Sequence, residues 1–366
     1  MKETQKILVE FAVAAMIALA VGAPIARAQG CVVARSNGET GGPESEGGYL
    51  TPGEFDFGIG YRHQFSFEHY VGDSVEHNAA GLTRTQLGTQ VENKINLENV
   101  SLTYQLTSRF SVTANMPILT ASRHSNNTDT FQLSDGVGDT SFLFSGWLWN
   151  PKENKRGNIQ IGFGLQIPTG NDDVITNLNG KPTVNDYSIQ PGSGGYGIIM
   201  QWAAYKNVPF AQLYFNGSYL ATPQNTNGIL RSASAANQPL TEYNSISDQY
   251  LLEAGVAAPI RKVQGLTLTF GPRFEGVPAN DLIGTSLGFR RPGFALSIEP
   301  GFQYYRNGNV FTFTIAKAMY RDRTRSAPDD LLGVYTGDAA FANYVWLASY
   351  SFRFDPLHRH QKASHT

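Results

Sequence analysis

Apolar and polar side chains alternate along most of the chain between residues 54 and 354. From Asn158 to Ile167 the odd positions carry Ile, Ile, Phe, Leu and Ile, whereas the even positions carry Asn, Gln, Gly, Gly and Gln. Because successive side chains of a strand point to opposite faces, this pattern predicts a β-strand with one apolar face and one polar face. Such runs predict about twelve strands, near residues 54–67, 91–106, 110–121, 138–149, 158–167, 194–205, 208–219, 248–260, 266–275, 294–305, 310–321 and 341–354.

The predicted strands are joined alternately by short and long connections. The short ones lie at residues 107–109, 150–157, 206–207, 261–265 and 306–309, and the others are rich in Asn, Ser, Gly and Asp. Asn307-Gly308 is a pair favoured in tight hairpin turns, where both central residues take positive φ. The predicted fold class is therefore all-β, a transmembrane antiparallel β-barrel of about 12 strands with short periplasmic turns and long extracellular loops.

The short connections also predict which residues face one another across the hairpins. The predicted pairs are Met200 with Leu213, Gln201 with Gln212, Leu252 with Phe274, Glu253 with Arg273, and Phe302 with Phe313. Apolar residues thus meet apolar residues, and polar residues meet polar ones. Since a slip of one residue would turn every side chain to the other face, this agreement supports the assignment of faces.

A few residues do not fit regular strands. Pro272 and Pro300 each remove a hydrogen bond from the ladder, which predicts local bulges. Lys317 falls on the apolar face of its strand, which predicts a bulge near Ile315 that exchanges the two faces beyond it. A soluble β-sandwich or a lipocalin-like barrel is the alternative fold, although the strands of a sandwich are usually shorter than these.

The N-terminal residues predict export. Lys2 and Lys6 precede an apolar stretch, and Ala26-Arg27-Ala28 offers small residues where a signal peptidase reads them. We divide the chain into a signal peptide at 1–28, an N-terminal lead-in segment at 29–53, the outer-membrane β-barrel at 54–354 and a C-terminal tail at 355–366. Cys31 follows the cleavage site, but no aliphatic residue stands three places before it, which favours a lone thiol over a lipid anchor.

Composition narrows the class of protein further. The 28 Lys and Arg residues are balanced by 30 Asp and Glu residues, and this balance disfavours a nucleic-acid partner. A single cysteine leaves no partner for a disulfide within the chain. Beyond the first thirty residues there is no uninterrupted apolar run of about 18 residues, the length that a membrane-spanning helix needs.

The parity of the strands assigns a set of polar residues to the interior of the barrel. The candidate lumen-lining or substrate-contacting residues are Arg62, Gln160, Gln166, Gln201, Gln212, Glu253, Arg273, Glu275, Glu299 and Gln303. Four of the charged ones come from three consecutive strands and predict one charged patch. The patch either lines a path for solutes or forms an ion-pair network that braces a narrow barrel. About twelve strands predict a constricted lumen.

No residue pattern predicts an enzyme, a cofactor or a metal site. Neither His63 nor His69 has a serine two residues away on its own face, as a hydrolase built on one strand would need. The histidines of the tail, His358, His360 and His365, are expected to be chance residues of a solvated segment. Arg321, Arg323 and Arg325 either meet lipopolysaccharide phosphates or are neutralised by nearby aspartates.

Two glycine-rich segments resemble those of a known family. Residues 135–140 read Asp-Gly-Val-Gly-Asp-Thr, and residues 162–171 read Gly-Phe-Gly-Leu-Gln-Ile-Pro-Thr-Gly-Asn. Together they resemble the signature of outer-membrane proteins associated with the meta-pathway of phenol degradation. This resemblance implies a transporter-like barrel for small hydrophobic or aromatic compounds. The alternating strand that ends at Phe354 also resembles the signal read by the barrel-assembly machinery, although residues 355–366 follow it.

These features together predict a channel or transporter for small molecules, hydrophobic or aromatic ones included, in the outer membrane of a Gram-negative cell. The expected partners are outer-membrane lipid and lipopolysaccharide, small-molecule solutes and the barrel-assembly machinery, with no nucleic acid. The alternative is a barrel that transports nothing and instead strengthens the envelope or binds an external partner. Fold alone does not distinguish the two.

Overall fold

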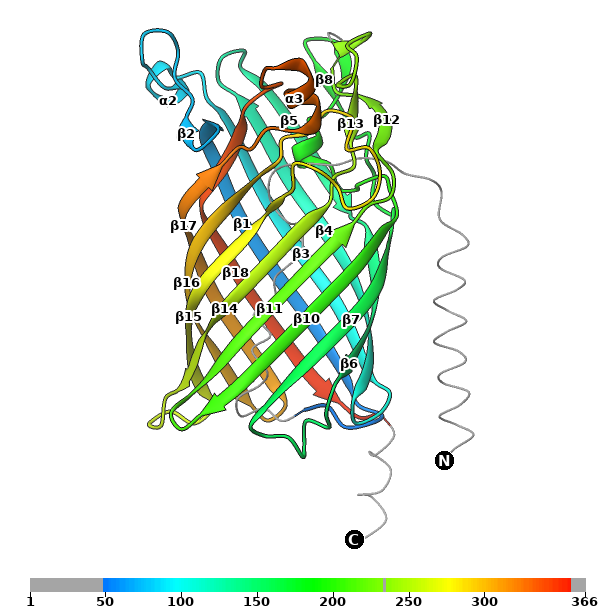
Figure 1. Ribbon diagram of the computed structural model, residues 1–366, viewed down its shortest axis with the longest axis vertical. Coiled ribbons are helices and arrows are strands. Elements are labelled where there is room, and N and C mark those ends of the chain that lie inside the picture. Colours follow the sequence, from blue (N-terminus) through cyan, green and yellow to red (C-terminus); the bar gives the residue numbers. More distant parts are fainter. Residues whose placement is uncertain (1–48, 233–234, 357–366) are drawn as a thin grey trace.

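The computed structural model describes residues 49–232 and 235–356, whose strands close into one antiparallel β-barrel (Figure 1). The strands of the wall are β1 (Phe55–Val71), β3 (Val91–Gln105), β4 (Phe110–Ser125), β5 (Thr130–Val137), β6 (Thr140–Trp147), β7 (Gly157–Ile167), β10 (Gly197–Val208), β11 (Ala211–Ala221), β14 (Gln249–Pro259), β15 (Leu266–Val277), β16 (Gly293–Arg306), β17 (Asn309–Asp322) and β18 (Ala339–Phe354). β5 and β6 both pair with β4 and are the two halves of one bent strand, so the wall has 12 strands. The predicted fold class is confirmed.

The sheet closes where the first and last strands meet. β1 pairs with β18 along most of its length, and the first pair is Phe55 with Phe354. The beginning of β1 and the end of β18 therefore lie at the same end of the barrel. A closed sheet leaves no unpaired strand edge, and this is the condition under which an extended chain can cross hydrocarbon. Among the described residues, no helix is long and apolar enough to span a membrane.

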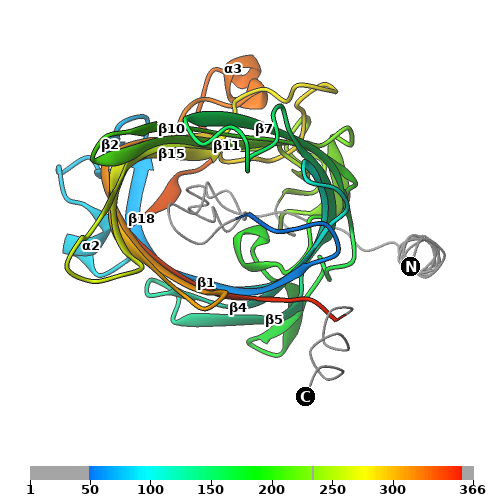
Figure 2. The same cartoon turned by 90° about the horizontal axis from the view of Figure 1, so that it is seen from below.

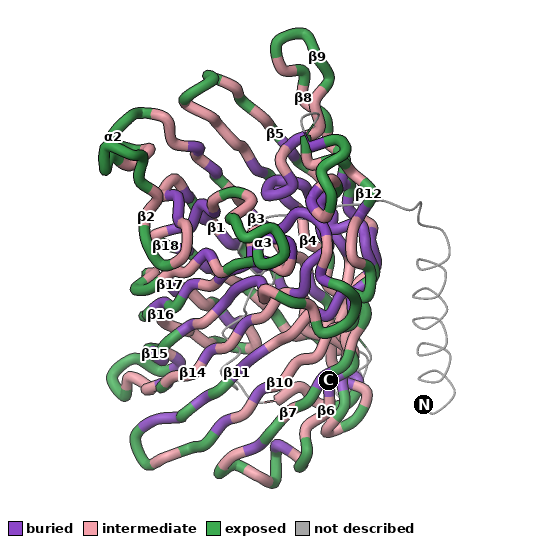
Figure 3. The backbone as a smooth tube through the Cα atoms, turned by 45° about the horizontal axis from the view of Figure 1, so that its top comes forward, coloured by how far each residue is buried: buried purple, intermediate pink, exposed green. Residues whose placement is uncertain are grey.

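The predicted alternation of faces is present, and the apolar face points outward. In β7 the side chains of Ile161, Phe163 and Leu165 are 43%, 60% and 63% exposed, while Gln160 faces the lumen. Buried and exposed positions alternate along the other strands in the same way (Figure 3). The outer surface therefore carries the apolar band that a bilayer would cover.

Two of the three predicted hairpin registers are confirmed. Phe302 pairs with Phe313, and the turn between their strands has both Asn307 and Gly308 at positive φ, of 51° and 81°. The predicted pairs of β14 with β15, Leu252 with Phe274 and Glu253 with Arg273, are also present.

The predicted turn between β10 and β11 is wrong. Both strands continue to Val208 opposite Ala211, so that Met200 faces Tyr219 rather than Leu213. The two turn residues are Pro209 and Phe210, because proline has no N–H to donate to the ladder. The predicted contact of Gln201 with Gln212 is lost, but the faces are kept because the shift is an even number of residues.

The predicted bulges at the two prolines are also wrong. The pairing of Glu253 with Arg273 and of Val256 with Phe270 follows one register across the level of Pro272. The same holds on both sides of Pro300, so each proline interrupts the ladder without shifting it. Lys317 stays on the outward face, 5.9 Å from the Tyr344 ring, and the irregularity of its strand lies at Met319 instead of near Ile315.

The wall strand predicted at residues 138–149 is longer and bent. Its upper half, β5, lies in a stretch that the sequence assigned to a loop. The bend falls at Gly136, whose φ is 150°, and at Gly138, whose N–H donates to the carbonyl of Pro117. Long loops gather at the upper end of the barrel and short turns at the lower end, as predicted (Figure 1).

The upper loops carry the remaining elements, namely β2 (Ser74–Val75), α2 (Arg84–Leu87), β8 (Ile175–Leu178), β9 (Lys181–Val184), η1 (Tyr187–Ile189), β12 (Thr226–Leu230), β13 (Tyr243–Ser245) and α3 (Ala327–Leu332). The loop that carries η1 folds back inside the ring of strands (Figure 2). The predicted signal peptide, Cys31 and the tail histidines lie outside the described residues.

Candidate functional site

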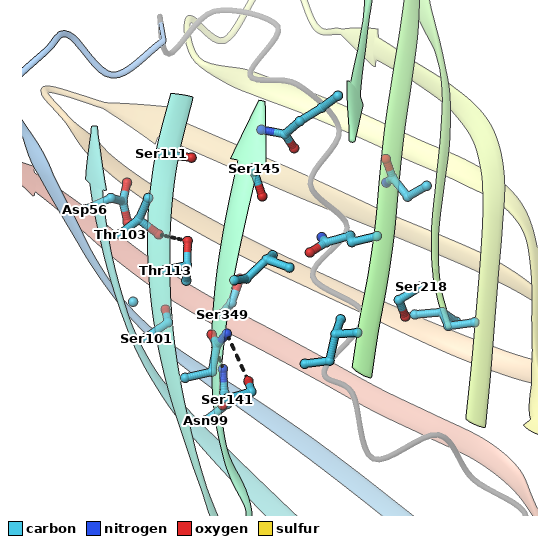
Figure 4. A pocket seen from close by; sticks show the side chains of 18 of the residues that line it. Asp56, Asn99, Ser101, Thr103, Ser111, Thr113, Ser141, Ser145, Ser218 and Ser349 are labelled. Carbon is cyan, nitrogen blue, oxygen red and sulfur yellow. Dashed lines mark hydrogen bonds between the residues drawn. The ribbon is translucent and has the colours of Figure 1, made fainter. Parts of the chain in front are cut away.

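A cavity of about 510 Å³ lies in the lumen (Figure 4). β3, β4, β6, β11 and β14 contribute most of its lining, and β1, β7, β10, β16, β17 and β18 contribute the remaining wall residues. Its lining is dominated by uncharged hydroxyl and amide side chains. They include Asn99, Ser101, Thr103, Ser111, Thr113, Asn115, Ser141, Ser145, Gln160, Gln201 and Ser218. Among the described residues, the charged side chains of the lining are Asp56, Asp139 and Glu253, and no Lys or Arg lines the cavity.

The alternation of β3 places the hydroxyl and amide side chains in the cavity wall. The odd positions of β3 face the lumen, and from Asn99 to Gln105 every one of them is a hydroxyl or amide residue. Thr103 Oγ1 lies 2.9 Å from Thr113 Oγ1 on β4. Asn99 donates to Asn115 at 3.5 Å, and Asn115 donates to Ser141 on β6 at the same distance. A ladder of weak hydrogen bonds therefore connects three strands along the wall.

Beside the cavity, on β1, β14, β15 and β16, a second group of inward polar residues is charged and closely packed. Arg62 of β1 makes a two-pronged contact with Glu275 of β15, at 3.1 and 2.9 Å. Arg273 contacts Glu275 at 2.9 Å and Glu253 at 2.5 Å, and it lies 3.6 Å from Glu299. Each of these five residues is at most 4% exposed. We call them the ion-pair network.

The ion-pair network crosses the interior of the barrel. β1 and β15 are not neighbours in the sheet, because β16, β17 and β18 lie between them. The Arg62–Glu275 contact therefore crosses the lumen and joins two separate parts of the wall. Burying charges is costly unless they are paired and hydrogen-bonded, and here two guanidinium groups meet three carboxylates, with Thr314 donating to Glu299 at 2.5 Å.

The loop between β7 and β10 covers the upper mouth of the cavity. Ile189 in η1 is fully buried against Leu97, Leu119 and Ala121 on the inward faces of β3 and β4. We call residues 168–196 the mouth loop. Its position depends on apolar contact with the inner wall, so it narrows the lumen from above (Figure 2).

An ionic contact holds the mouth loop in place. Asp186 contacts Arg291 through two oxygens, at 3.2 and 3.1 Å, and lies 3.4 Å from Arg123 on β4. Burial alone would raise the pKa of Asp186, but the two guanidinium groups and the backbone N–H of Ser188 hold that pKa well below its usual range. Asp186 is therefore ionised and bridges the loop to two other parts of the barrel.

The glycine-rich segments form a close backbone crossing at the base of the mouth loop. Asp139 accepts from the backbone N–H of Gly170 at 3.1 Å and of Ser193 at 2.6 Å. A Cβ on Gly170 would lie 2.5 Å from the Cα of Gly192, so only glycine fits there. The conformation of this crossing explains why the segment needs glycine at that position.

The ten residues predicted to line the lumen all come from inward faces. Nine of them fall into two groups, and Gln212 belongs to neither. Gln160, Gln166, Gln201, Gln303 and Glu253 line the cavity. Arg62, Arg273, Glu275 and Glu299 join Glu253 in the ion-pair network. Gln212 is buried below the cavity and donates to Asn207 at 2.7 Å. Only Glu253 belongs to both groups.

The hydroxyl-rich wall of the cavity was not predicted from the sequence. The alternation in β3 carried the signal, because residues 99, 101, 103 and 105 are all small or neutral polar residues. An inward aromatic cluster at the lower end was not predicted either; there Trp147 meets the ring of Tyr205 at 5.8 Å and that of Tyr49 at 5.9 Å.

The sequence left two alternatives for Arg321, Arg323 and Arg325, namely lipopolysaccharide phosphates or a nearby aspartate. Arg323 is buried and contacts Asp329 at 3.0 Å. Arg321 donates to the hydroxyl of Tyr70 at 2.9 Å. Arg325 lies 5.0 Å from the Tyr335 ring. The alternative, neutralisation by a nearby aspartate, is present at Arg323.

No family model and no curated protein matches the chain. An outer membrane channel from Pseudomonas putida F1 shares the fold, with a TM-score of 0.55 and 12% identity over 84% of this chain and 98% of that one. The translocator domain of the autotransporter NalP from Neisseria meningitidis gives 0.43 and 11%, over 84% and 90%. The toluene transporter TbuX from Ralstonia pickettii gives 0.39 and 10%, over 83% and 90%. The similarity is one of fold, and the resemblance to the phenol-degradation family stays a prediction.

Proposed function

We propose that the protein is a channel in the outer membrane of a Gram-negative cell and that it passes small uncharged molecules, aromatic compounds among them. The cavity with its neutral polar lining carries this proposal. The outward apolar band and a fold shared with an outer membrane channel support the membrane location.

The chemistry of the lining favours uncharged solutes. Hydroxyl and amide groups can exchange hydrogen bonds with a solute in place of water, and Leu97, Leu143 and Ile199 add apolar surface to the same cavity. An anionic solute would lose hydration without meeting a free positive charge, because Arg62 and Arg273 are already engaged by carboxylates. A ring that carries hydroxyl groups fits both features of the lining.

Uptake into liposomes tests the proposal. Phenyl glucoside is uncharged, aromatic and too polar to cross lipid readily, and phenyl phosphate is its charged counterpart. We expect folded protein to accelerate entry of the glucoside several-fold more than entry of the phosphate. Thr113→Trp should fill the cavity and reduce glucoside entry about tenfold, whereas Ala204→Trp on the outward face of β10 should leave it unchanged.

A barrel that transports nothing is the second candidate, because the ion-pair network crosses the lumen and the mouth loop covers its upper end. The uptake experiment distinguishes this candidate from a channel. Protein shown to be folded by its gel mobility before and after heating would then accelerate neither solute, and Thr113→Trp would change nothing.

A further inference from the structure

A group of polar side chains interrupts the apolar band on the outer surface of the barrel. We define the wall patch as His63, Lys94, Asn96, Glu98, Thr120, Ser122 and Asp135, on β1, β3, β4 and β5. Along β3 the outward residues from the lower edge are Tyr104, Leu102 and Val100, and then Glu98, Asn96 and Lys94. On the flanking strands, Tyr61 and Ile118 pair with Glu98. The interruption therefore falls within the band.

The wall patch begins at the depth of the hydrocarbon. Six residues separate Tyr104 from Glu98, which places Glu98 about 15 Å above Tyr104 for a strand tilted by about 40°. The apolar band of such barrels is about 25 Å tall. A carboxylate that faces lipid tails at this depth is costly, and acidic groups in membrane-spanning segments usually face a polar partner.

The residues of the wall patch are held in position but not neutralised. Asn96 accepts at its Oδ1 from the Tyr61 hydroxyl and from Nδ1 of His63, each at 2.8 Å. The His63 ring is therefore oriented, and its Nε2 is directed away from Asn96. Within the described part of the chain, neither Lys94, Glu98 nor Asp135 forms an ion pair. Within the described residues these three side chains meet no opposite charge.

The arrangement of these charges is self-complementary about an axis along the membrane normal. On the near face of Figure 1 the strands rise to the right, while β14, β11, β10 and β7 follow one another in that direction. With the same tilt, a strand spacing of about 4.8 Å and the observed pairings, His63 and Glu98 lie within about 2 Å of the same height. Lys94 and Asp135 share a second height, about 10 Å further up.

Each of these pairs straddles one vertical line. Asn96 and Ser122 lie close to that line, with His63 and Lys94 on one side of it and Glu98 and Asp135 on the other. Rotation by 180° about the line exchanges the two sides and keeps every height. A second copy therefore brings an acid opposite each basic group.

We propose that the wall patch is the interface of a two-fold homodimer in the membrane, in which His63 meets the partner subunit's Glu98 and Lys94 meets the partner subunit's Asp135. His63 donates through Nε2 when the ring carries its second proton. The proposal depends on the membrane location but not on transport, so solute uptake can fail while the dimer stands. Lipopolysaccharide phosphates suit the patch poorly, because two carboxylates would face them with one lysine.

Cysteine cross-linking tests the axis directly. Ser122→Cys in a Cys31→Ser background should form a disulfide-linked dimer on mild oxidation of the full chain in liposomes. Ala204→Cys, on the outward face of β10 across the barrel, should stay monomeric at the same protein-to-lipid ratio. Equal cross-linking of both variants, or none at Ser122→Cys in protein shown to be folded, overturns the proposal.

Charge reversal tests the partners. Lys94→Asp or Asp135→Lys should each weaken dimerisation in bilayers at least about tenfold, and the double variant should restore it because the exchanged charges meet again across the axis. Lys206→Asp on β10 is the control and should have no effect. If the double variant is as weak as the single ones, if the unaltered chain is monomeric, or if bound lipopolysaccharide occupies the patch, the proposal is wrong.

Discussion

The cavity lining and the ion-pair network use polar residues in opposite ways. Around the cavity most polar groups are neutral, and their mutual hydrogen bonds include long ones such as that of Asn99 with Asn115 at 3.5 Å. In the ion-pair network every guanidinium group has short contacts with carboxylates, and each member is nearly free of solvent exposure. An inward polar residue of a barrel is therefore a candidate for binding a solute only when it does not already form an ion pair with another residue of the barrel.

Removing one arginine from the ion-pair network should cause the largest loss of stability. Arg273→Met leaves the three carboxylates of the ion-pair network with Arg62 alone. An uncompensated buried charge typically costs about 3–5 kcal/mol. We therefore expect the free energy of unfolding, measured by urea titration in lipid vesicles, to fall by about that amount.

The matched substitution in the cavity lining should reduce the free energy of unfolding only slightly. Gln201→Met removes a polar group from the cavity lining, where no close partner is lost, and should change the same free energy by less than about 1 kcal/mol. Equal losses from Arg273→Met and Gln201→Met would remove the distinction between the cavity lining and the ion-pair network.

The base of the mouth loop should show the next largest effect. Gly170→Ala would place a methyl group 2.5 Å from the Cα of Gly192, and overpacking of this kind typically costs about 1–3 kcal/mol. The substitution should also shift the mouth loop and change single-channel conductance in planar bilayers. Gly180→Ala, in the same loop, is the control for space, because nothing lies within 4 Å of its added methyl group, although its φ of 80° adds some strain. If Gly170→Ala leaves the single-channel conductance unchanged, the mouth loop does not limit conduction.

The ionic contact of the mouth loop should have a smaller, pH-dependent effect. The pKa of Asp186 is held below its usual range in the folded protein. A lowered pKa in the folded state contributes stability above the ordinary aspartate pKa of about 3.9, and this contribution is lost progressively as the pH falls from that value through the folded-state pKa. Asp186→Asn should thus lower stability by about 1–2 kcal/mol at pH 7 and raise the open probability. The difference from the unaltered chain should shrink below about pH 4. A difference as large at pH 3 as at pH 7 would point to another cause.

Adding a charge to the cavity lining should affect selectivity more than stability. Ser141→Asp places an unpaired carboxylate in a solvated cavity, where it should cost less than about 1 kcal/mol. The reversal potential in a salt gradient should shift toward cation selectivity, as rings of acidic side chains produce in cation pores. Ser141→Asn is the neutral control. An unchanged reversal potential would place Ser141 outside the path of ions.

Local pattern determined the class of fold, the outward and inward faces and the approximate strand limits. A period of two is a property of neighbouring residues, so Phe163 and Gln160 could be assigned to opposite faces without knowing their surroundings. The Asn307-Gly308 turn was equally predictable, because its positive φ values depend on the two residues themselves.

The tertiary structure decided which inward residues meet. Arg62 and Glu275 lie 213 residues apart and on strands that are not neighbours, so only closure of the barrel brings them together. The same holds for Ile189, which the mouth loop carries onto the inner wall of β3 and β4. The alternating pattern determines which face a side chain occupies, but the curvature of the closed sheet determines which residues that side chain contacts across the lumen.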